Sequence, residues 1–113
     1  EAVKAADTLS AQGIALEIID LRTIRPLDMA TIIASVKKTN RLVILEESWP
    51  FGSIASEIAF QVQDNAFDYL DAPVQKINTA DTPAPYSPVL LEEWLPSAQD
   101  VVDAVNRVMY TKA

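Results

Sequence analysis

The sequence predicts an α/β fold, a three-layer α/β/α domain with a mostly parallel sheet. Helical stripes and short apolar runs alternate along residues 1–113, as they do when helices connect parallel strands. One of these runs, Leu42–Leu45, is continuously apolar, which is typical of a strand covered on both faces. A third sign is a strand that leads directly into a helix at residues 20–28. Together these observations favour one domain with helices on both sides of one sheet.

The turn at residues 20–28 joins the first predicted strand to the second predicted helix. Ile14–Ile19 is short, apolar and rich in β-branched residues, which predicts a buried strand. Pro26 cannot prolong a sheet ladder, and Asp28 stands where the N-cap of a helix would stand. The helix should end at Asn40 in the left-handed conformation. Its apolar stripe has amphipathic spacing and consists of Met29, Ile32, Ile33 and Val36.

The remaining elements follow from similar signals. A helix with a stripe of small residues opens the chain and ends at Gly13, and a third helix begins at Ser53. The mixed pattern of Val74–Asn78 predicts a strand near the edge of the sheet. Residues 79–96 contain four prolines, so we expect a long extended connection without a helix. A capping box at Ser97 predicts the start of the last helix.

The beginning of the chain lacks the signals that mark the other elements. No capping residue precedes the first helix, and three strands are few for a layer of this kind. We therefore expect a fragment of a longer protein, missing the first strand of its sheet. One edge of the sheet would then be bare and prone to association.

Composition restricts the chemistry that this chain can perform. It has no histidine and no cysteine, which removes the commonest general base, the usual metal ligands and any disulfide. The apolar runs are too short to span a bilayer. Residues 43–113 carry eleven acidic and three basic side chains, a net charge of −8, which should repel nucleic acid and anionic lipid. Such a surface either favours a basic protein partner or serves solubility alone.

Two loops stand at the carboxyl ends of predicted strands, where open α/β sheets bind ligands: residues 20–28 and 46–53. Glu46 and Glu47 could bind a metal or share a proton, but adjacent residues on a strand point to opposite faces. We expect instead that Arg22 pairs with Glu46 or Glu47 and ties the two loops together. No catalytic, cofactor-binding or metal-binding residue is predicted.

Several aromatic side chains fall in loops or off the buried helical stripes, and such side chains often meet another chain. Between two of them, Gly52–Ser53 could hold an anion at a helix start, although a plain N-cap is the simpler interpretation. The predicted subunit-interface residues are Trp49, Phe51, Phe60, Phe67, Tyr86 and Trp94.

Longer strings of the sequence resemble a known family. Residues 20–28, and the strand ending in Glu46 and Glu47 before Gly52 and a helix, resemble the start of the transketolase carboxyl-terminal domain. More narrowly, three strings resemble the beta subunits of the decarboxylating component of pyruvate dehydrogenase: Glu46–Pro50, Ala66–Pro73 and Ala80–Tyr86. The resemblance covers essentially the whole chain.

This resemblance implies an assembly and docking domain of an acetyl-transferring pyruvate dehydrogenase, with no catalytic residue of its own. Thiamine diphosphate and magnesium would be held by other parts of the enzyme, so no cofactor ligand is expected here. The implied partners are an alpha subunit and a second beta subunit in a heterotetramer, and the basic subunit-binding domain of the dihydrolipoyl acetyltransferase. The implied location is the bacterial cytoplasm or the mitochondrial matrix.

Other functions are compatible with the same residues. The chain could be the equivalent domain of a branched-chain 2-oxoacid dehydrogenase or of another transketolase-like enzyme. It could also be a stand-alone α/β domain that binds a small ligand with the loops at residues 20–28 and 46–53. The choice of oxoacid lies in segments that this sequence does not contain.

Overall fold

The computed structural model describes residues 1–111. Helices and short strands follow one another along the chain, but the strand predicted at Ile14–Ile19 is missing and a helix at Pro88–Trp94 is additional. The elements are α1 (Ala2–Ser10), α2 (Met29–Thr39), β1 (Val43–Leu45), α3 (Ile54–Ala66), the 3-10 turn η1 (Phe67–Tyr69), β2 (Gln75–Ile77), α4 (Pro88–Trp94) and α5 (Ala98–Val108).

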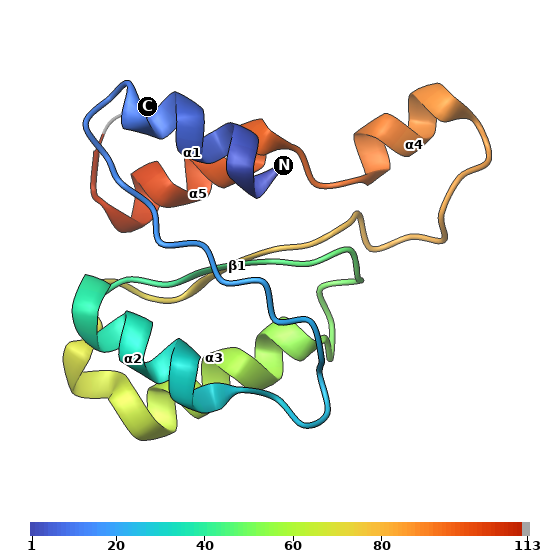
Figure 1. Ribbon diagram of the computed structural model, residues 1–113. Coiled ribbons are helices and arrows are strands. Elements are labelled where there is room, and N and C mark those ends of the chain that lie inside the picture. Colours follow the sequence, from blue (N-terminus) through green and yellow to red (C-terminus); the bar gives the residue numbers. More distant parts are fainter. Residues whose placement is uncertain (112–113) are drawn as a thin grey trace.

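The strands β1 and β2 are parallel neighbours, with Ile44 opposite Lys76. Main-chain hydrogen bonds continue the pairing beyond the strands, from Glu46 N–H to the Ile77 carbonyl (3.0 Å) and from Thr79 N–H to the Ser48 carbonyl (3.0 Å). Figure 1 shows α1 and α5 on one side of this sheet and α2 and α3 on the other. The predicted three-layer α/β/α architecture with a parallel sheet is therefore confirmed.

Each side of the sheet has its own hydrophobic cluster, because successive side chains of a strand point to opposite faces. Val43 and Leu45 pack against the cluster formed by α1 and α5, which includes the fully buried Leu9. Ile44 belongs to the cluster formed by α2 and α3, together with Val36 and Val62. The continuous apolar run of the second predicted strand thus contributes side chains to the hydrophobic clusters on both sides of the sheet.

The helix ends follow local sequence signals. The carboxylate of Asp28 accepts the N–H of Thr31 (3.1 Å) at the start of α2, and Asn40 ends that helix with a φ of 64°. The carboxylate of Asp100 accepts the N–H of Ser97 (2.8 Å) while the Ser97 hydroxyl accepts the N–H of Asp100 (3.2 Å). These caps confirm the predicted starts of α2 and α5 and the predicted end of α2.

The prediction of a strand at Ile14–Ile19 is wrong. Residues 14–20 are extended but are not part of the sheet. Within the part of the chain that the structure describes, residues 15–20 make no main-chain hydrogen bond to another residue's main chain. A strand requires a hydrogen-bonded neighbour, and this segment has none although its side chains are suited to a sheet.

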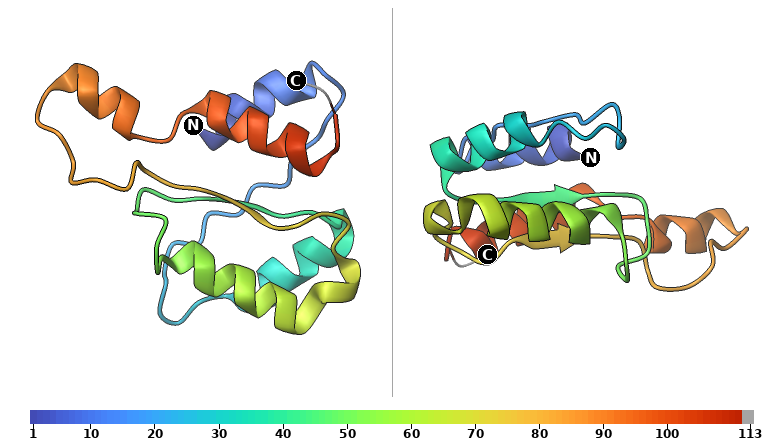
Figure 2. Two further views of the ribbon diagram at one scale, coloured as in Figure 1. Left: turned by 180° about the vertical axis from the view of Figure 1, so that it is seen from behind. Right: turned by 90° about the horizontal axis from the view of Figure 1, so that it is seen from below.

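The prediction that residues 79–96 contain no helix is also wrong, since α4 occupies Pro88–Trp94. Pro88 is at the first turn of that helix, where a missing N–H removes no helical hydrogen bond. The short helix stands apart from both helix layers in every view (Figures 1 and 2). The chain from residue 78 to residue 97 therefore forms a long excursion from the carboxyl end of β2; we call it the strap.

Candidate functional site

The carboxyl ends of β1 and β2 are joined by Glu46. One carboxylate oxygen of Glu46 accepts the side-chain N–H of Asn78 (2.7 Å), and the other accepts the N–H of Ala55 in the first turn of α3 (3.2 Å). Glu46 therefore fixes the end of β2 and caps α3 at the same time. Ser53 occupies the N-cap position of α3, but its side chain makes no capping hydrogen bond.

The predicted tie between Arg22 and Glu46 or Glu47 is wrong. Arg22 forms its ion pair with Asp20 (3.1 Å), two residues earlier in the same loop. Both partners are well exposed to solvent, and Arg22 has a φ of 58°. The loop folds back on itself in this way because its positive φ turns the Arg22 backbone toward Asp20, whose carboxylate also accepts the Arg22 N–H (3.2 Å).

The two tryptophans converge on one carbonyl group of the strap. Trp49 and Trp94 each donate an indole N–H to the carbonyl oxygen of Thr82, and both distances are 2.8 Å. Lys76 of β2 ties the same loop to the sheet, because its ammonium group donates to the Pro50 carbonyl and to the Ser56 hydroxyl of α3. The strap and the loop at residues 46–53 are thus held together at the carboxyl ends of the strands.

Sequence reasoning identified the two indoles but missed Thr82 and Asn78. A carbonyl acceptor leaves no signal in the sequence, since every residue has one. The signal that was available is the position of Asn78, a hydrogen-bonding side chain directly after a strand. Its placement opposite Glu46 follows from the parallel register of β1 and β2.

The predicted interface residues divide into two groups. Phe51 and Trp49 lie in the loop after β1, and Tyr86 lies in the strap just before α4; their exposed fractions are 91%, 51% and 103%. Trp94 is half-buried beside them. Phe60 and Phe67 lie on α3 and η1 and are also exposed.

The strap adds further exposed apolar side chains to the first group. Val89 and Leu90, in the first turn of α4, are exposed by 68% and 55%. Exposed apolar side chains at this density are typical of surfaces that meet another protein. We call Trp49, Phe51, Tyr86, Val89 and Leu90 the aromatic edge.

A hollow beside this edge is lined by carboxylates. It has a volume of about 530 Å³ and includes Glu46 and Glu47 from the β1 end, Glu92 from α4 and Glu1 from the start of α1. Among residues 1–111, no group of three or more acidic, histidine or cysteine side chains is arranged to hold a metal ion. The hollow is better suited to a basic side chain, which needs opposite charge but no fixed coordination geometry.

Among residues 1–111, three carboxylates have a pKa below its ordinary value. A hydrogen bond from Lys4, and then one from the Ala98 N–H, lowers the pKa of Glu1. A hydrogen bond from Lys38 lowers the pKa of Glu17, and hydrogen bonds from the Thr31 hydroxyl and N–H lower that of Asp28. Each of these carboxylates stabilises a helix end or a connection between elements, and none suggests a group tuned for proton transfer.

No helix among the described residues is both long enough and apolar enough to cross a membrane.

Comparison with known proteins gives consistent results. The family model "Transketolase, C-terminal domain" matches residues 1–101. The pyruvate dehydrogenase E1 component subunit beta of Rhizobium meliloti is 56% identical over 109 residues, which are 96% of this chain and 24% of that protein. The subunit of the same name from Rickettsia bellii is 52% identical over 98% of this chain and 34% of its own length.

Two further comparisons extend this picture. The mitochondrial pyruvate dehydrogenase E1 component subunit beta-2 of Oryza sativa subsp. japonica is 52% identical over 96% of this chain and 29% of its own length. A solved structure described as a split gene transketolase, inactive beta4 tetramer, superimposes with a TM-score of 0.83 at 30% identity, covering 99% of this chain and 36% of that one. The chain thus spans about a quarter to a third of the curated relatives, and it belongs to the transketolase C-terminal domain family.

Proposed function

We propose that residues 1–113 form one domain of a longer pyruvate dehydrogenase E1 beta subunit, and that this domain assembles the enzyme without performing its chemistry. The observation that carries the proposal is the identity of 50–56% with several subunits of that name over nearly the whole chain. The full enzyme would oxidatively decarboxylate pyruvate and transfer the acetyl group to a lipoyl group. Its location would be the cytoplasm of a bacterium or the mitochondrial matrix.

The cofactors are proposed to bind outside this domain. Thiamine diphosphate and magnesium would be expected in the full enzyme, but the described residues offer no cluster of oxygen ligands suited to a metal ion. Gly52 precedes α3 without the glycine-rich spacing that cradles a diphosphate. We therefore assign no step of the reaction to a residue of this chain.

The partners follow from the surface chemistry. The aromatic edge, with Phe60 and Phe67 as a second group, is proposed to meet the alpha subunit and a second beta subunit in a heterotetramer. The acidic second half of the chain and the carboxylate-lined hollow are proposed to attract the basic subunit-binding domain of the dihydrolipoyl acetyltransferase. A branched-chain 2-oxoacid dehydrogenase remains the alternative, but the similar subunits given above are all named for pyruvate.

Subunit assembly provides the test. The full-length beta subunit would be prepared with Phe51→Ser and Tyr86→Ser, mixed with the alpha subunit and examined by analytical ultracentrifugation. We expect the assembly to dissociate at protein concentrations at which the parent remains intact, because exposed aromatic anchors carry much of the energy of an interface. Tyr110→Ser is the matched control, since Tyr110 is an aromatic residue exposed by 69% after the end of α5 and lines neither the hollow nor the aromatic edge.

Two results would contradict the proposal. One is unchanged assembly of the double variant, which would show that the aromatic edge is not part of the subunit interface. The other is decarboxylation of pyruvate by the 113-residue chain alone, measured with thiamine diphosphate and magnesium present, which would place the chemistry in this domain.

A further inference from the structure

The outer part of the strap is an uncharged stretch that is rich in proline. Residues 82–91 carry no charge, and acidic residues flank them on both sides, Asp81 before the stretch and Glu92 after it. We call residues 82–88 the proline tip. Its prolines are Pro83, Pro85 and Pro88.

The base of the strap is closed by hydrogen bonds, and the proline tip extends beyond it. The Ala80 N–H donates to the Trp94 carbonyl (3.1 Å), and the Thr82 carbonyl accepts both indoles. Within the described chain, residues 83–86 form no main-chain hydrogen bond to another main-chain group. Tyr86 is fully exposed, α4 buries no residue, and Figure 2 shows this part of the chain extending away from both helix layers. The domain thus holds the two ends of the strap and leaves the proline tip uncovered.

Local sterics restrict the backbone of the proline tip before any partner binds. Each of its three prolines has a φ fixed near about −65°. Thr82, Ala84 and Ser87 each precede a proline, which disfavours the helical conformation and favours an extended or polyproline II backbone. Ser87 has a φ of −65° and a ψ of 128°, close to the polyproline II values of about −75° and +145°. In the proline tip, only Tyr86 is without such a restriction.

This conformation limits the kinds of surface that can bind the proline tip. A sheet edge is unsuited, because a proline has no N–H with which to complete a strand ladder. Polyproline II segments are instead bound in grooves lined with aromatic side chains, and a conformation that is set in advance lowers the entropy lost on binding. The acidic residues Asp81 and Glu92 favour basic side chains at the two ends of such a groove.

The charges also separate the available partners. A second copy of this chain would bring its own carboxylate-lined hollow and acidic flanks close to Asp81 and Glu92, and like charges repel. A basic domain that binds mainly through charge has no counterpart in the uncharged tip itself. A permanent subunit interface has an apolar core in which charged residues are depleted, and the proline tip matches that composition.

We propose that the alpha subunit binds the proline tip in a groove that is lined with aromatic side chains and has basic side chains at both ends. This inference rests on the proposed function, which brings an alpha subunit to the aromatic edge, and it adds the segment that is recognised and the manner of recognition.

A labelled peptide tests the proline tip by itself. A peptide of residues 81–93, capped at both ends and carrying a fluorophore, is titrated with the alpha subunit and followed by fluorescence anisotropy. We expect saturable binding. The peptide with Pro83→Ala and Pro85→Ala should bind about fourfold to thirtyfold more weakly, because it loses the restriction of its free conformations. The basic subunit-binding domain and the beta subunit are titrated in parallel, and neither should bind.

Salt dependence tests the basic ends of the groove. Peptides with Asp81→Asn or Glu92→Gln should each bind about 1.5-fold to fivefold more weakly than the parent at low ionic strength. At high ionic strength the three peptides should bind equally, because salt screens exposed charges. An equal affinity of the three peptides at low salt would contradict the basic ends.

The full-length beta subunit tests the same contact in the enzyme. Pro83→Ala combined with Pro85→Ala should raise the dissociation constant for the alpha subunit at least about fourfold, measured by analytical ultracentrifugation. Pro73→Ala is the matched control, since Pro73 is an exposed proline before β2 and outside the strap, and it should leave assembly unchanged. Thermal melting by circular dichroism shows whether both variants are folded.

The outcomes separate this inference from the proposed function. Equal binding of the parent and double-alanine peptides would show that the preset conformation plays no part, and binding only to the basic subunit-binding domain would identify a different partner. If the peptide fails to bind the alpha subunit while Phe51→Ser with Tyr86→Ser still dissociates the assembly, the inference fails and the proposed function stands. Unchanged assembly of both the aromatic and the proline variants would overturn both.

Discussion

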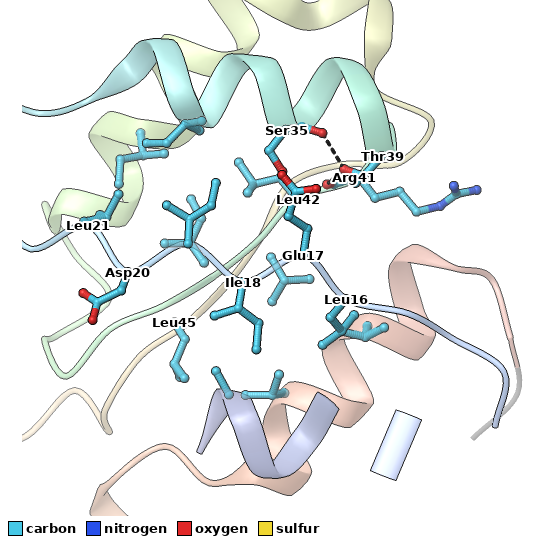
Figure 3. Close-up of a pocket in the computed structure, with 18 of the residues that line it drawn as sticks. Leu16, Glu17, Ile18, Asp20, Leu21, Ser35, Thr39, Arg41, Leu42 and Leu45 are labelled. Atoms are coloured by element: carbon cyan, nitrogen blue, oxygen red, sulfur yellow. Dashed lines mark hydrogen bonds between the residues drawn. The ribbon is translucent and has the colours of Figure 1, made fainter. Parts of the chain in front are cut away.

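The two edges of β1 differ in what they contact. One edge pairs with β2, and beyond it Glu46, Asn78, Trp49 and Thr82 continue the connection through side chains. The other edge borders a cavity of about 1030 Å³, which we call the slot, opposite the extended residues 14–20 (Figure 3). Both edges are flanked by apolar residues, so hydrophobicity does not distinguish them. The comparison teaches that apolar β-branched residues prepare a segment for a sheet, while a hydrogen-bonded neighbour is what makes it a strand.

The largest expected effect is on the free energy of unfolding, and it compares a side chain in the hydrophobic cluster of α1 and α5 with one in the extended segment beside the slot. Leu9→Ala removes a fully buried side chain that packs against α5, and it should lower the free energy of unfolding by about 2–5 kcal/mol. Leu16→Ala, in the extended segment, should cost less than about 1.5 kcal/mol because its side chain is half-exposed. Urea denaturation measures both. Equal losses of stability in the two variants would mean that residues 14–20 are packed as tightly as the cluster of α1 and α5.

A smaller loss of stability is expected when Glu46, which joins the carboxyl ends of β1 and β2, is replaced. Glu46→Ala should cost about 1–3 kcal/mol, because it leaves the Ala55 N–H and the Asn78 amide without their acceptor. The matched control is Glu47→Ala, a neighbouring exposed glutamate that should change stability by less than about 0.5 kcal/mol. Urea denaturation of both variants gives the comparison. A loss at Glu47 as large as that at Glu46 would mean that charge, not hydrogen bonding, stabilises this edge.

The two tryptophans should show a non-additive effect. Trp49→Phe or Trp94→Phe alone leaves the Thr82 carbonyl with one indole donor, so each should cost less than about 1 kcal/mol. The double variant leaves that carbonyl without either donor and should cost more than the sum of the two single losses by about 0.5–1 kcal/mol. A double-mutant cycle by urea denaturation measures this difference. Simple additivity would mean that solvent replaces the indoles at no cost.

The smallest expected effect is the pH dependence of the ion pair between Glu17, in the extended segment, and Lys38 of α2. The hydrogen bond from Lys38 lowers the pKa of Glu17, so this contact stabilises the fold above the ordinary carboxyl range and is lost as pH falls through the lowered pKa. Glu17→Gln should therefore be less stable than the parent near neutral pH, and the difference should shrink at an acidic pH at which Glu17 is protonated. Urea denaturation at the two pH values measures it, and added salt should shrink the neutral-pH difference. An equal difference at both pH values would contradict the assignment.

Local signals made much of the fold predictable. Asp28, Asn40 and Ser97 act within three or four residues of their own positions, so their roles as caps could be inferred from the sequence. The same is true of the apolar stripe of α2, of which the structure buries Ile32 and Val36 and half-buries Met29 and Ile33. Val43 and Ile44 pack on opposite sides of the sheet because successive side chains of any strand point to opposite faces.

Features that depend on distant residues were not predictable in the same way. Ile14–Ile19 has the composition of a strand, but its state depends on a neighbour that the composition does not reveal. Arg22 was expected to pair with Glu46 or Glu47, yet it has a positive φ and forms its ion pair with Asp20 in the same loop. At α4, four prolines argued against a helix, whereas the position of Pro88 at the first turn removes the penalty.

The convergence of both indoles on Thr82 has a spectroscopic consequence. The chain has two tryptophans, and both report on the same point where the strap meets the loop at residues 46–53. Intrinsic fluorescence of this protein therefore monitors the attachment of the strap, while circular dichroism monitors the helices of the two layers. If the strap detaches before the layers unfold, the two melting curves separate, and the fluorescence midpoint lies at the lower temperature.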